Sequence, residues 1–309
     1  MSSKRFSQVD RVRRHTSRAA IDDIDSMTRR NVREHATESL IGLDRRIAEL
    51  EREWDVERTL EANASTLALT GAVLGTTGNK RWFWLTGAVL TFLFQHATSG
   101  WCPPLPVLRR LGVRTQSEID QERYALKAIR GDFNMGAEER PPVRKVLDSI
   151  SATEATVEPQ REPDRVRRYT SSQQLRKIDS TMERRVRLYA DRSPEEIAAR
   201  IAELRREWSI ERYLQINVAA VGLGTTALAL THNRKWGLAT CAALGFFLCH
   251  SIEGFDPMLP ILRRYGVRSR AEIDREIYAL KVLRGDFDDV TQARDEEEQV
   301  EAALAAVGV

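Results

Sequence analysis

Four apolar runs, uncharged through their middles, interrupt a chain that is otherwise rich in charge. They form two pairs, each joined by a four-residue polar turn: residues 59–77 with Trp82–Thr98, and Tyr213–Thr231 with Trp236–Ile252. Each run has fewer than 20 residues, which is the short end of the about 17–25 residues of a membrane-spanning helix. The pattern therefore predicts two helical hairpins, at about 59–98 and 213–252.

Before each hairpin, apolar residues recur at helical spacing. Ile21, Ile24 and Val32 predict a helix over about 18–35, and the same pattern predicts its counterpart over 172–190. A second helix begins at Ser193-Pro194-Glu195-Glu196, where a serine cap, a proline and two acids all favour a helix start. No residue stops this helix before the apolar run. Residues 194–231 therefore predict one rod of about 57 Å at 1.5 Å per residue.

After each hairpin, the sequence predicts a short helix punctuated by prolines and then a longer helix. The capping boxes Thr115-x-x-Glu118 and Ser269-x-x-Glu272 predict where the longer helix starts. Gly131 and its counterpart Gly285 predict where it ends. Every predicted element is helical, so the expected fold class is all-α.

The whole pattern occurs twice. DRVRRHTS at 10–17 returns as DRVRRYTS at 164–171, an offset of 154 residues, and the same offset places YALKAIRGDF on YALKVLRGDF. No gap is needed over roughly 124 positions, of which about half are identical, so we infer a tandem repeat with one hairpin in each unit. The expected organisation is a disordered N-terminus (1–9), unit 1 (10–135), a linker (136–163), unit 2 (164–290) and an acidic tail (291–309).

Composition narrows the functional class. Charged residues make up 30% of the chain, the net charge is only +3, and three cysteines (102, 241 and 249) form no CxxC pair. These values argue against a disulfide scaffold, a zinc site and nucleic-acid binding. The sequence also lacks a nucleophile–base pair and a glycine-rich phosphate loop that follows a strand. We therefore expect no enzyme, no cofactor and no metal.

The apolar runs would suit either a membrane or the core of a soluble helical bundle, and three features favour the membrane. The middles of the runs carry no charge. Aromatic residues stand at the run ends, where a membrane interface would lie, at Trp82, Trp84, Trp101, Trp236 and Phe255. Small residues recur at every fourth position, as in closely packed membrane helices, at Gly71, Gly75, Gly237, Cys241 and Gly245.

The distribution of cations predicts the orientation. Each hairpin turn carries two cations, whereas the flanks within about 20 residues carry roughly seven or eight. Cytoplasmic segments are enriched in Lys and Arg, so we expect four spans with both termini and the helical arms in the cytoplasm. No signal peptide precedes the first unit, and insertion would depend on the internal segments.

One stretch of each unit follows a recognisable order: the pair Glu57-Arg58, a hairpin, GWCPPL, and then LGVRT. This order resembles the YgaP-like transmembrane domain family over about 60 residues per unit, at 57–115 and 211–269. The positions that carry the resemblance are Gly100, Cys102, Pro103 and Gly112, and in the second unit Gly254, Pro257 and Gly266. The second unit departs from the pattern, with Asp256 at the cysteine position and Ser269 at the threonine position.

The resemblance implies a multi-pass helical-hairpin domain of the bacterial inner (plasma) membrane, in a family of largely unknown function. In the relative that names the family, this domain anchors a cytosolic rhodanese and dimerises. None of the three cysteines here is followed by the arginine-bearing loop that a rhodanese needs. For Cys102, packing is the preferred interpretation, with a reactive or metal-binding thiol as the alternative.

Several polar residues allow two interpretations each. The intramembrane polar residues could form a relay or conduit, or could hydrogen-bond a neighbouring helix, the hairpin partner or a lipid headgroup: Asn63, His96, Asn217 and His250. The arginines before each first helix could contact lipid headgroups or a partner, or could form a solvated face: Arg11, Arg13, Arg14, Arg165, Arg167 and Arg168.

The favoured hypothesis is a non-enzymatic integral membrane protein with an anchoring or oligomerising role. Its hairpins would pair within or between chains, and its cytoplasmic arms would contact lipids or an unknown protein. The first alternative is a small-solute or ion conduit between the hairpins. The second is a soluble helical-bundle adaptor whose apolar runs are a buried core.

Overall fold

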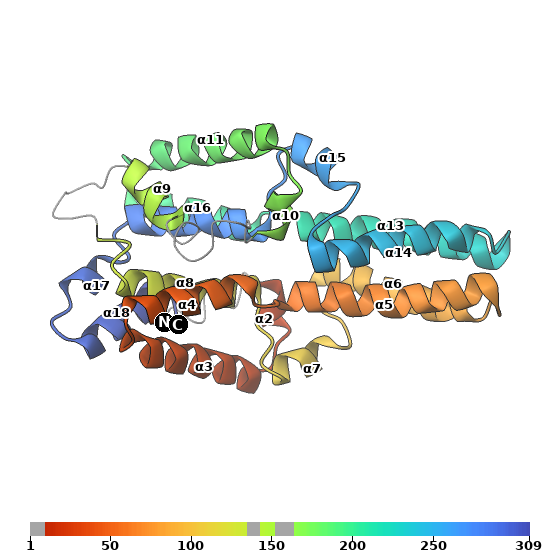
Figure 1. The fold of residues 1–309 in the computed structure, drawn as a ribbon, viewed down its shortest axis with the longest axis horizontal. Helices are drawn as coiled ribbons and strands as arrows, with labels where there is room; N and C mark the ends of the chain where they lie inside the picture. The colour runs from red at the N-terminus through yellow and green to blue at the C-terminus, as the bar shows by residue number, and fades with distance from the viewer. Residues whose placement is uncertain (1–9, 135–142, 152–163) are drawn as a thin grey trace.

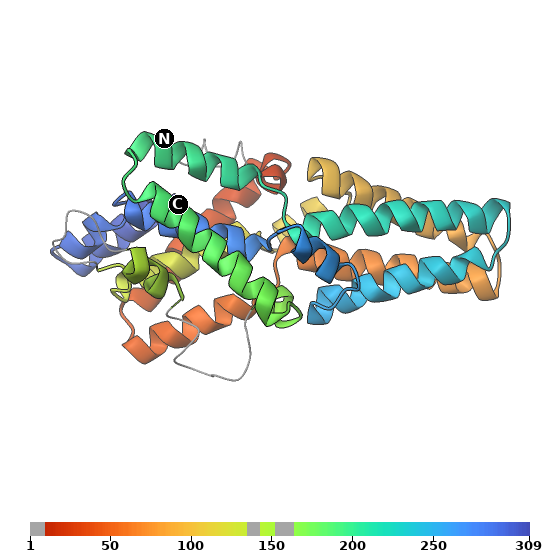
Figure 2. The same cartoon turned by 90° about the horizontal axis from the view of Figure 1, so that it is seen from above.

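The computed structural model describes residues 10–134, 143–151 and 164–309. Every regular element in these residues is a helix, which confirms the all-α prediction. Figures 1 and 2 show two parts, an elongated four-helix bundle and a body built from the other helices. The predicted disordered N-terminus (1–9) and most of the predicted linker lie outside the described residues.

We call residues 10–151 the N-terminal half and residues 164–309 the C-terminal half. The helices of the N-terminal half are α2 (Arg11–Arg14), α3 (Arg18–Ala36), α4 (Leu40–Arg52), α5 (Val56–Thr77), α6 (Trp82–Ser99), α7 (Leu105–Arg110), α8 (Gln116–Ile129) and α9 (Val143–Ser151). Those of the C-terminal half are α10 (Arg165–Arg168), α11 (Ser172–Tyr189), α12 (Pro194–Arg206), α13 (Ile210–Thr231), α14 (Trp236–Glu253), α15 (Leu259–Arg264), α16 (Arg270–Leu283), α17 (Asp288–Gln292) and α18 (Glu296–Val307).

The helix starts agree with the capping signals in the sequence. Thr115 with Glu118 and Ser269 with Glu272 form complete capping boxes at the starts of α8 and α16. In each box the hydroxyl accepts a hydrogen bond from a free backbone N–H, and the glutamate accepts one from the capping residue. Ser193 caps α12 in the same way, with Pro194 in the first turn.

The predicted rod over 194–231 is wrong, because the chain leaves the helix between α12 and α13. Glu207 has an extended backbone, with φ −62° and ψ 138°. The N–H of Ile210 donates to the carbonyl of Arg268 at 2.9 Å, and the Arg268 side chain holds Glu207 at 2.9 and 2.6 Å. The local sequence contains no helix-breaking residue at this point, so we infer that the tertiary ion pair between Arg268 and Glu207 ends the helix. The N-terminal half has the same break, with Val56 bound to Arg114.

The bundle consists of the two predicted hairpins, α5–α6 and α13–α14. Besides its own hairpin partner, each helix packs along one helix of the other hairpin, α5 along α14 and α6 along α13. Small and apolar side chains fill this contact, among them Ala68, Ala72, Leu90, Leu244 and Phe247. The hairpins therefore pair within one chain, as Figure 2 shows.

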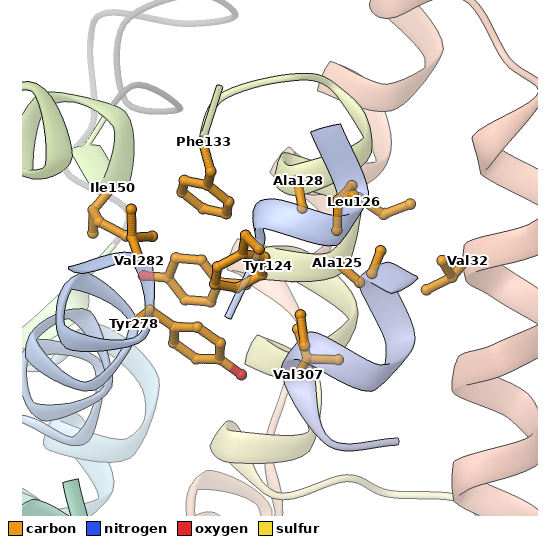
Figure 3. Close-up of a cluster of buried hydrophobic side chains, with 14 of the residues drawn as sticks. Val32, Tyr124, Ala125, Leu126, Ala128, Phe133, Ile150, Tyr278, Val282 and Val307 are labelled. Carbon is orange, nitrogen blue, oxygen red and sulfur yellow. The ribbon is translucent and has the colours of Figure 1, made fainter. Parts of the chain in front are cut away.

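In the body, α8 and α16 form the contact between the halves. The rings of Tyr124 and Tyr278 stack there with centroids 3.7 Å apart, and Phe133 and Phe287 follow at 4.6 Å. Figure 3 shows Tyr124, Tyr278 and Phe133 inside one apolar cluster, to which Phe287 also belongs. The amphipathic helices α3 and α4 cover α8, and α11 and α12 cover α16.

The segments expected as linker and acidic tail contribute helices to this core. The linker helix α9 follows the N-terminal half but packs on α16 and α11 of the other half, through Val146 and Ile150. The tail helix α18 ends the chain but packs on α8 and α3, through Val300 and Leu304. Each half is therefore completed by a helix that lies outside its predicted repeat unit.

Two buried lysines close the free ends of these exchanged helices. Lys127 on α8 donates to the carbonyl of Ile150 at 2.7 Å, and Lys281 on α16 donates to that of Ala306 at 2.9 Å. Such carbonyls lack an intrahelical donor and lie at the negative end of the helix dipole. Desolvation by burial lowers the pKa of both lysines, to about 7.

These lysines predict a stability that rises above neutral pH. With a folded pKa of about 7 and an ordinary value of 10.5, the unfolded chain binds more protons between these limits, so the unfolding free energy increases with pH. We expect a gain of at least about 1 kcal/mol between pH 7.5 and 9.5, because one pKa unit corresponds to about 1.4 kcal/mol. Thermal unfolding at the two pH values measures the gain.

The double variant Lys127→Met/Lys281→Met should lose this gain. Replacement of the exposed Lys177 by Met should leave it unchanged. An equal pH dependence in the double variant and the original chain would contradict the assignment.

Candidate functional site

Buried polar side chains close the bundle at the end nearest the body. The Glu57 carboxylate on α5 accepts a hydrogen bond from Arg11 at 2.7 Å and lies 3.0 Å from Nε2 of His96 on α6. Nε2 of Gln215 on α13 donates to Glu57 at 2.7 Å and to Glu61 at 3.2 Å. Residues from three bundle helices and from α2 therefore meet around two carboxylates.

The fourth bundle helix brings a histidine with weaker ties. His250 on α14 is fully buried, and neither ring nitrogen makes a hydrogen bond of normal geometry to the described residues. Arg165 of α10 lies 3.4 Å from Glu61. We call the whole group the base cluster: Arg11, Glu57, Glu61, His96, Arg165, Gln215 and His250. Its two guanidinium groups lie beside its two acids, Arg11 beside Glu57 and Arg165 beside Glu61.

The two halves differ inside the base cluster. The residue 154 positions after Glu61 is Gln215, so one half has an acid where the other has an amide. Glu211 is the counterpart of Glu57, but its carboxylate accepts a hydrogen bond from the backbone N–H of Arg270 at 3.3 Å. His250 therefore lacks the carboxylate that its counterpart His96 binds.

Two arginines complete the C-terminal end of α6. Arg11 donates to the carbonyls of His96 and Ala97 at 2.8 and 2.7 Å. Arg212, from α13 of the opposite half, donates to the carbonyls of Ala97 and Thr98 at 2.8 and 3.1 Å. Cations at a helix C-terminus satisfy orphan carbonyls and oppose the helix dipole.

The end of α14 is completed in the same way. Arg165 donates to the carbonyls of His250 and Ser251 at 2.7 and 2.8 Å, and Arg58 of the opposite half donates to those of Ser251 and Ile252, both at 2.9 Å. The crossing arginines also stack on tryptophans, Arg58 on Trp54 at 4.1 Å and Arg212 on Trp208 at 3.9 Å. Each hairpin therefore supplies a cap that the other hairpin needs.

Glycine allows the one-turn helices α2 and α10 to reach these ends. Gly100 and Gly254 adopt left-handed backbone conformations, with φ of 87° and 93°. A Cβ at Gly100 would lie 2.7 Å from the carbonyl oxygen of Arg11, and one at Gly254 would lie 2.3 Å from that of Arg165. The motif glycines therefore serve both the turn and a close backbone contact.

Most of the predicted helix-packing residues lie at helix contacts. Gly71 and Gly75 face Thr86 and Phe83 of their own hairpin partner α6. Gly237 faces Thr76 and Phe83 of the opposite hairpin, and Cys241 packs against the bundle core. Gly245 differs, since a Cβ there would meet no atom within 4 Å. Gly222 was not predicted, although it lies against Leu90 of α6.

The four polar residues that were expected to lie within the membrane divide into two pairs. His96 and His250 lie inside the base cluster, and His96 makes the predicted contact across its hairpin. Asn63 and Asn217 instead donate to their own helices, at the carbonyls of Thr59 and Tyr213, both at 2.8 Å. The expectation that these asparagines bind a neighbouring helix is wrong, because each side-chain amide donates to a carbonyl one turn earlier in its own helix.

The predicted lipid-contact arginines are largely engaged within the protein. Arg13 is buried between Asp25 and Glu118, and Arg167 between Asp179 and Glu272. Arg11 and Arg165 belong to the base cluster, and Arg168 lies 3.8 Å from Glu253. Of the six, Arg14 is exposed. Lipid contact is therefore ruled out for Arg13 and Arg167, since their ion pairs are buried.

The remaining motif residues have structural surroundings. Cys102 is buried among Val12, Val56, Leu60 and Leu105, and this burial raises the pKa of its thiol to about 12, which agrees with packing. Pro103 and Pro257 are exposed in the turns before α7 and α15. Gly112 and Gly266 adopt φ of 81° and 77° after these helices, with open space around them.

Sequence reasoning missed the acids and amide of the base cluster and the crossing arginines. Glu57 and Arg58 drew attention only through the family resemblance, and Glu61, Gln215 and Arg212 drew none. The sequence did contain a signal for these residues. Charged residues stand in the first turns of both α5 and α13, whose remaining turns carry no charge. Positions that differ between the two halves, Glu61 and Gln215 above all, carry further information.

Comparison with known proteins adds no relative. No family model matches the chain, no curated protein matches it, and no solved structure matches it. Within the described residues, no three His, Cys, Asp or Glu side chains are grouped to hold a metal ion. The resemblance to the YgaP-like family therefore stays a prediction.

By length and hydropathy, two helical stretches of the described chain could cross a membrane. They are Pro194–Thr231, which contains α13, and α14. Neither helix of the first hairpin, α5 or α6, meets the same criteria of length and hydropathy. The criteria therefore select two helices, whereas four spans were expected. It is less apolar, because α5 has Ser65 and Thr66 where α13 has alanines, and α6 has Gln95 where α14 has Cys249.

The reciprocal caps predict a shared loss of stability. The double variant Arg58→Met/Arg212→Met removes four charge-assisted bonds to helix ends, and we expect it to lower the free energy of unfolding by about 2 kcal/mol. Thermal unfolding of the purified chain measures this loss. Arg81→Met, in the exposed hairpin turn, is the matched control. Equal midpoints for the double variant and the control would refute the capping role.

The motif glycines predict unequal costs. Gly266→Ala places a Cβ in open space, so only the left-handed backbone penalty of about 1–2 kcal/mol applies. Gly254→Ala adds a contact 2.3 Å from the Arg165 carbonyl and should cost clearly more. Chemical denaturation of the two variants gives the comparison. Similar losses would show that the close approach of α10 does not matter.

Proposed function

We propose that the chain is a non-enzymatic integral membrane protein, in which two tandem units each insert one helical hairpin. The four bundle helices would cross the plasma membrane, and the body would lie in the cytoplasm. The role is to anchor and position the helical body at the membrane. The observation that carries this proposal is the outer surface of the bundle.

That surface is apolar along the bundle. Large hydrophobic side chains exposed on it include Leu67, Val73, Leu74, Trp84, Phe92, Phe94, Val221, Leu228, Leu238 and Phe246. The stretches 62–79, 82–99, 213–233 and 236–252 contain no Asp, Glu, Lys or Arg. A water-soluble bundle would carry charged and polar residues on its outer face. Apolar surface on all four helices supports a lipid environment.

Exposed hydroxyl and amide groups on the bundle are satisfied without water. Asn63, Thr66, Thr70 and Thr77 lie along one exposed stripe of α5. Each donates to the carbonyl four residues earlier in the same helix, at 2.7–2.8 Å. Lipid cannot supply hydrogen bonds, so this internal pairing is what a membrane helix requires.

Length and aromatic placement agree with a span. At 1.5 Å per residue, the 22 residues of α5 and α13 measure about 33 Å and the 18 residues of α6 and α14 about 27 Å, against a hydrocarbon thickness of about 30 Å. The six tryptophans of the chain lie at the two ends of the bundle: Trp54, Trp101 and Trp208 near the body, and Trp82, Trp84 and Trp236 near the turns. Aromatic belts mark both interfaces of a membrane.

The bundle interior favours an anchor over a conduit. Beyond the base cluster, Ala68, Ala72, Leu90, Leu244 and Phe247 pack into a single apolar cluster with their neighbours. Asn63, one of the expected path residues, lies on the outer surface. Membrane lipids are the proposed immediate partners. The body offers surface for a second copy of the chain or a cytoplasmic protein, and nothing in the site calls for nucleic acid or a cofactor.

A charge on the bundle surface tests this proposal. Leu67 is 54% exposed in the middle of α5, and Ile41 is 73% exposed on the body. If the bundle spans the membrane, Leu67→Arg should reduce the fraction retained after an alkaline-carbonate wash, because a central arginine costs about 3 kcal/mol in insertion. Ile41→Arg should behave like the original chain.

The same wash applied to the original chain is the first readout. Retention in the membrane pellet is expected. Release into the supernatant, with Leu67→Arg as soluble as Ile41→Arg, would overturn the proposal and leave a soluble bundle.

A further inference from the structure

The short helices α7 and α15 present apolar residues outward beside the base of the bundle. Val107 and Leu111 are 57% and 74% exposed at α7, and Ile261 and Tyr265 are 47% and 84% exposed at α15. In each helix the two residues are four apart and therefore share one face. Figure 1 places α7 and α15 on opposite sides of the bundle, next to the helix ends that face the body.

The inward faces of these helices are held firmly. Leu105 and Leu259 are buried, and Arg109 and Arg263 behind them are fully buried in ion pairs with Glu118 and Glu272. The shortest of these contacts are both 2.6 Å. The direction of the outward face is therefore fixed by the body, and the exposure of Leu111 and Tyr265 does not result from a loose end.

Each outward face also carries one unpaired cation. Arg110 and Arg264 are exposed, and neither has an acidic partner within the described part of the chain. Their neighbours in sequence, Arg109 and Arg263, are the buried ones. An apolar face with a cation beside it is typical of a helix that lies at the surface of a membrane containing anionic lipids.

The position of the helices along the bundle selects a lipid surface over a protein. α7 contacts α5, whose first two turns hold Glu57 and Glu61, and the uncharged stretch begins at residue 62. The membrane boundary of the proposed function would therefore lie at the level of α7. α15 has the same place in the C-terminal half. A planar membrane is the partner that both faces, on opposite sides of the bundle, could contact at once.

We propose that α7 and α15 lie in the headgroup layer and bind anionic phospholipids. This inference rests on the proposed membrane span. Val107, Leu111, Ile261 and Tyr265 enter the boundary between headgroups and acyl chains, and Arg110 and Arg264 contact lipid phosphates. The two helices would fix the depth and tilt of the bundle and hold the body against the membrane.

Spin labels on the full chain in phosphatidylcholine vesicles, with or without phosphatidylglycerol, test this inference. Single cysteines replace Leu111, Tyr265, Leu67 or Ile41 in a chain whose own three cysteines are changed to alanine. Collisions with oxygen report lipid, and collisions with a nickel complex report water. We expect oxygen to dominate at 111 and 265, as at 67, and nickel to dominate at 41.

The control positions separate the two proposals. Nickel access at 111 and 265 with oxygen access at 67 would overturn the inference and leave the span intact. Nickel access at 67 would overturn the span itself. Protection from both reagents at 111 and 265 would indicate a protein contact, which also refutes lipid docking.

A charge variant tests the lipid preference. Phosphatidylglycerol should draw the labels at 111 and 265 deeper in the original background. Arg110→Gln/Arg264→Gln should abolish this difference, whereas Arg81→Gln in the hairpin turn should keep it. An unchanged response in the double variant would refute the assignment of the two arginines to anionic headgroups.

Discussion

The carbonyl groups at the ends of α6 and α14 determine how the two halves of the chain meet. The last carbonyls of a helix have no intrahelical donor, and at the closed base of a bundle water is a poor substitute. Arg212 reaches α6 from the opposite half, and Arg58 reaches α14. Neither hairpin has a complete end without the other. The pairing of hairpins, the one-turn helices and the close approaches at the glycines all serve this constraint.

In the body, too, the ends of helices are completed by side chains from other helices. α9 and α18 pack on the half to which they do not belong in sequence, and Lys127 and Lys281 satisfy their terminal carbonyls across the interface. The halves are therefore interlocked at both ends of the molecule, with Tyr124 against Tyr278 in between. Two halves that only lay side by side would lack these exchanges. The exchanged helices also explain why the segments after each unit are apolar on one face.

Local signals predicted the helices, whereas the contacts between them depended on distant residues. The period of the apolar positions, the serine and threonine caps and the 154-residue offset were sufficient for the hairpins and for most helix starts. They did not predict the break before Ile210, because the competing partner is Arg268, far along the chain. They also led to lipid contacts for Arg13 and Arg167, since a sequence does not show which acids a folded chain brings to an arginine. Of the base cluster, the sequence pointed to the two histidines and, for a different role, to Arg11 and Arg165.

The base cluster and the apolar surface above it together define one boundary. In the base cluster Arg11 lies beside Glu57 and Arg165 beside Glu61, and such a polar group belongs where the protein, not lipid, surrounds it. Beyond Glu61, α5 exposes large apolar side chains such as Leu67 and Leu74 and buries small residues such as Ala68 and Ala72. This arrangement suits both lipid contact and tight helix pairing. Gln215, which corresponds to Glu61 in the C-terminal half, donates hydrogen bonds to both Glu57 and Glu61. An ionised carboxylate at 215 could not donate these bonds and would place a third acid beside the other two, so the amide suits the way the two hairpins pair.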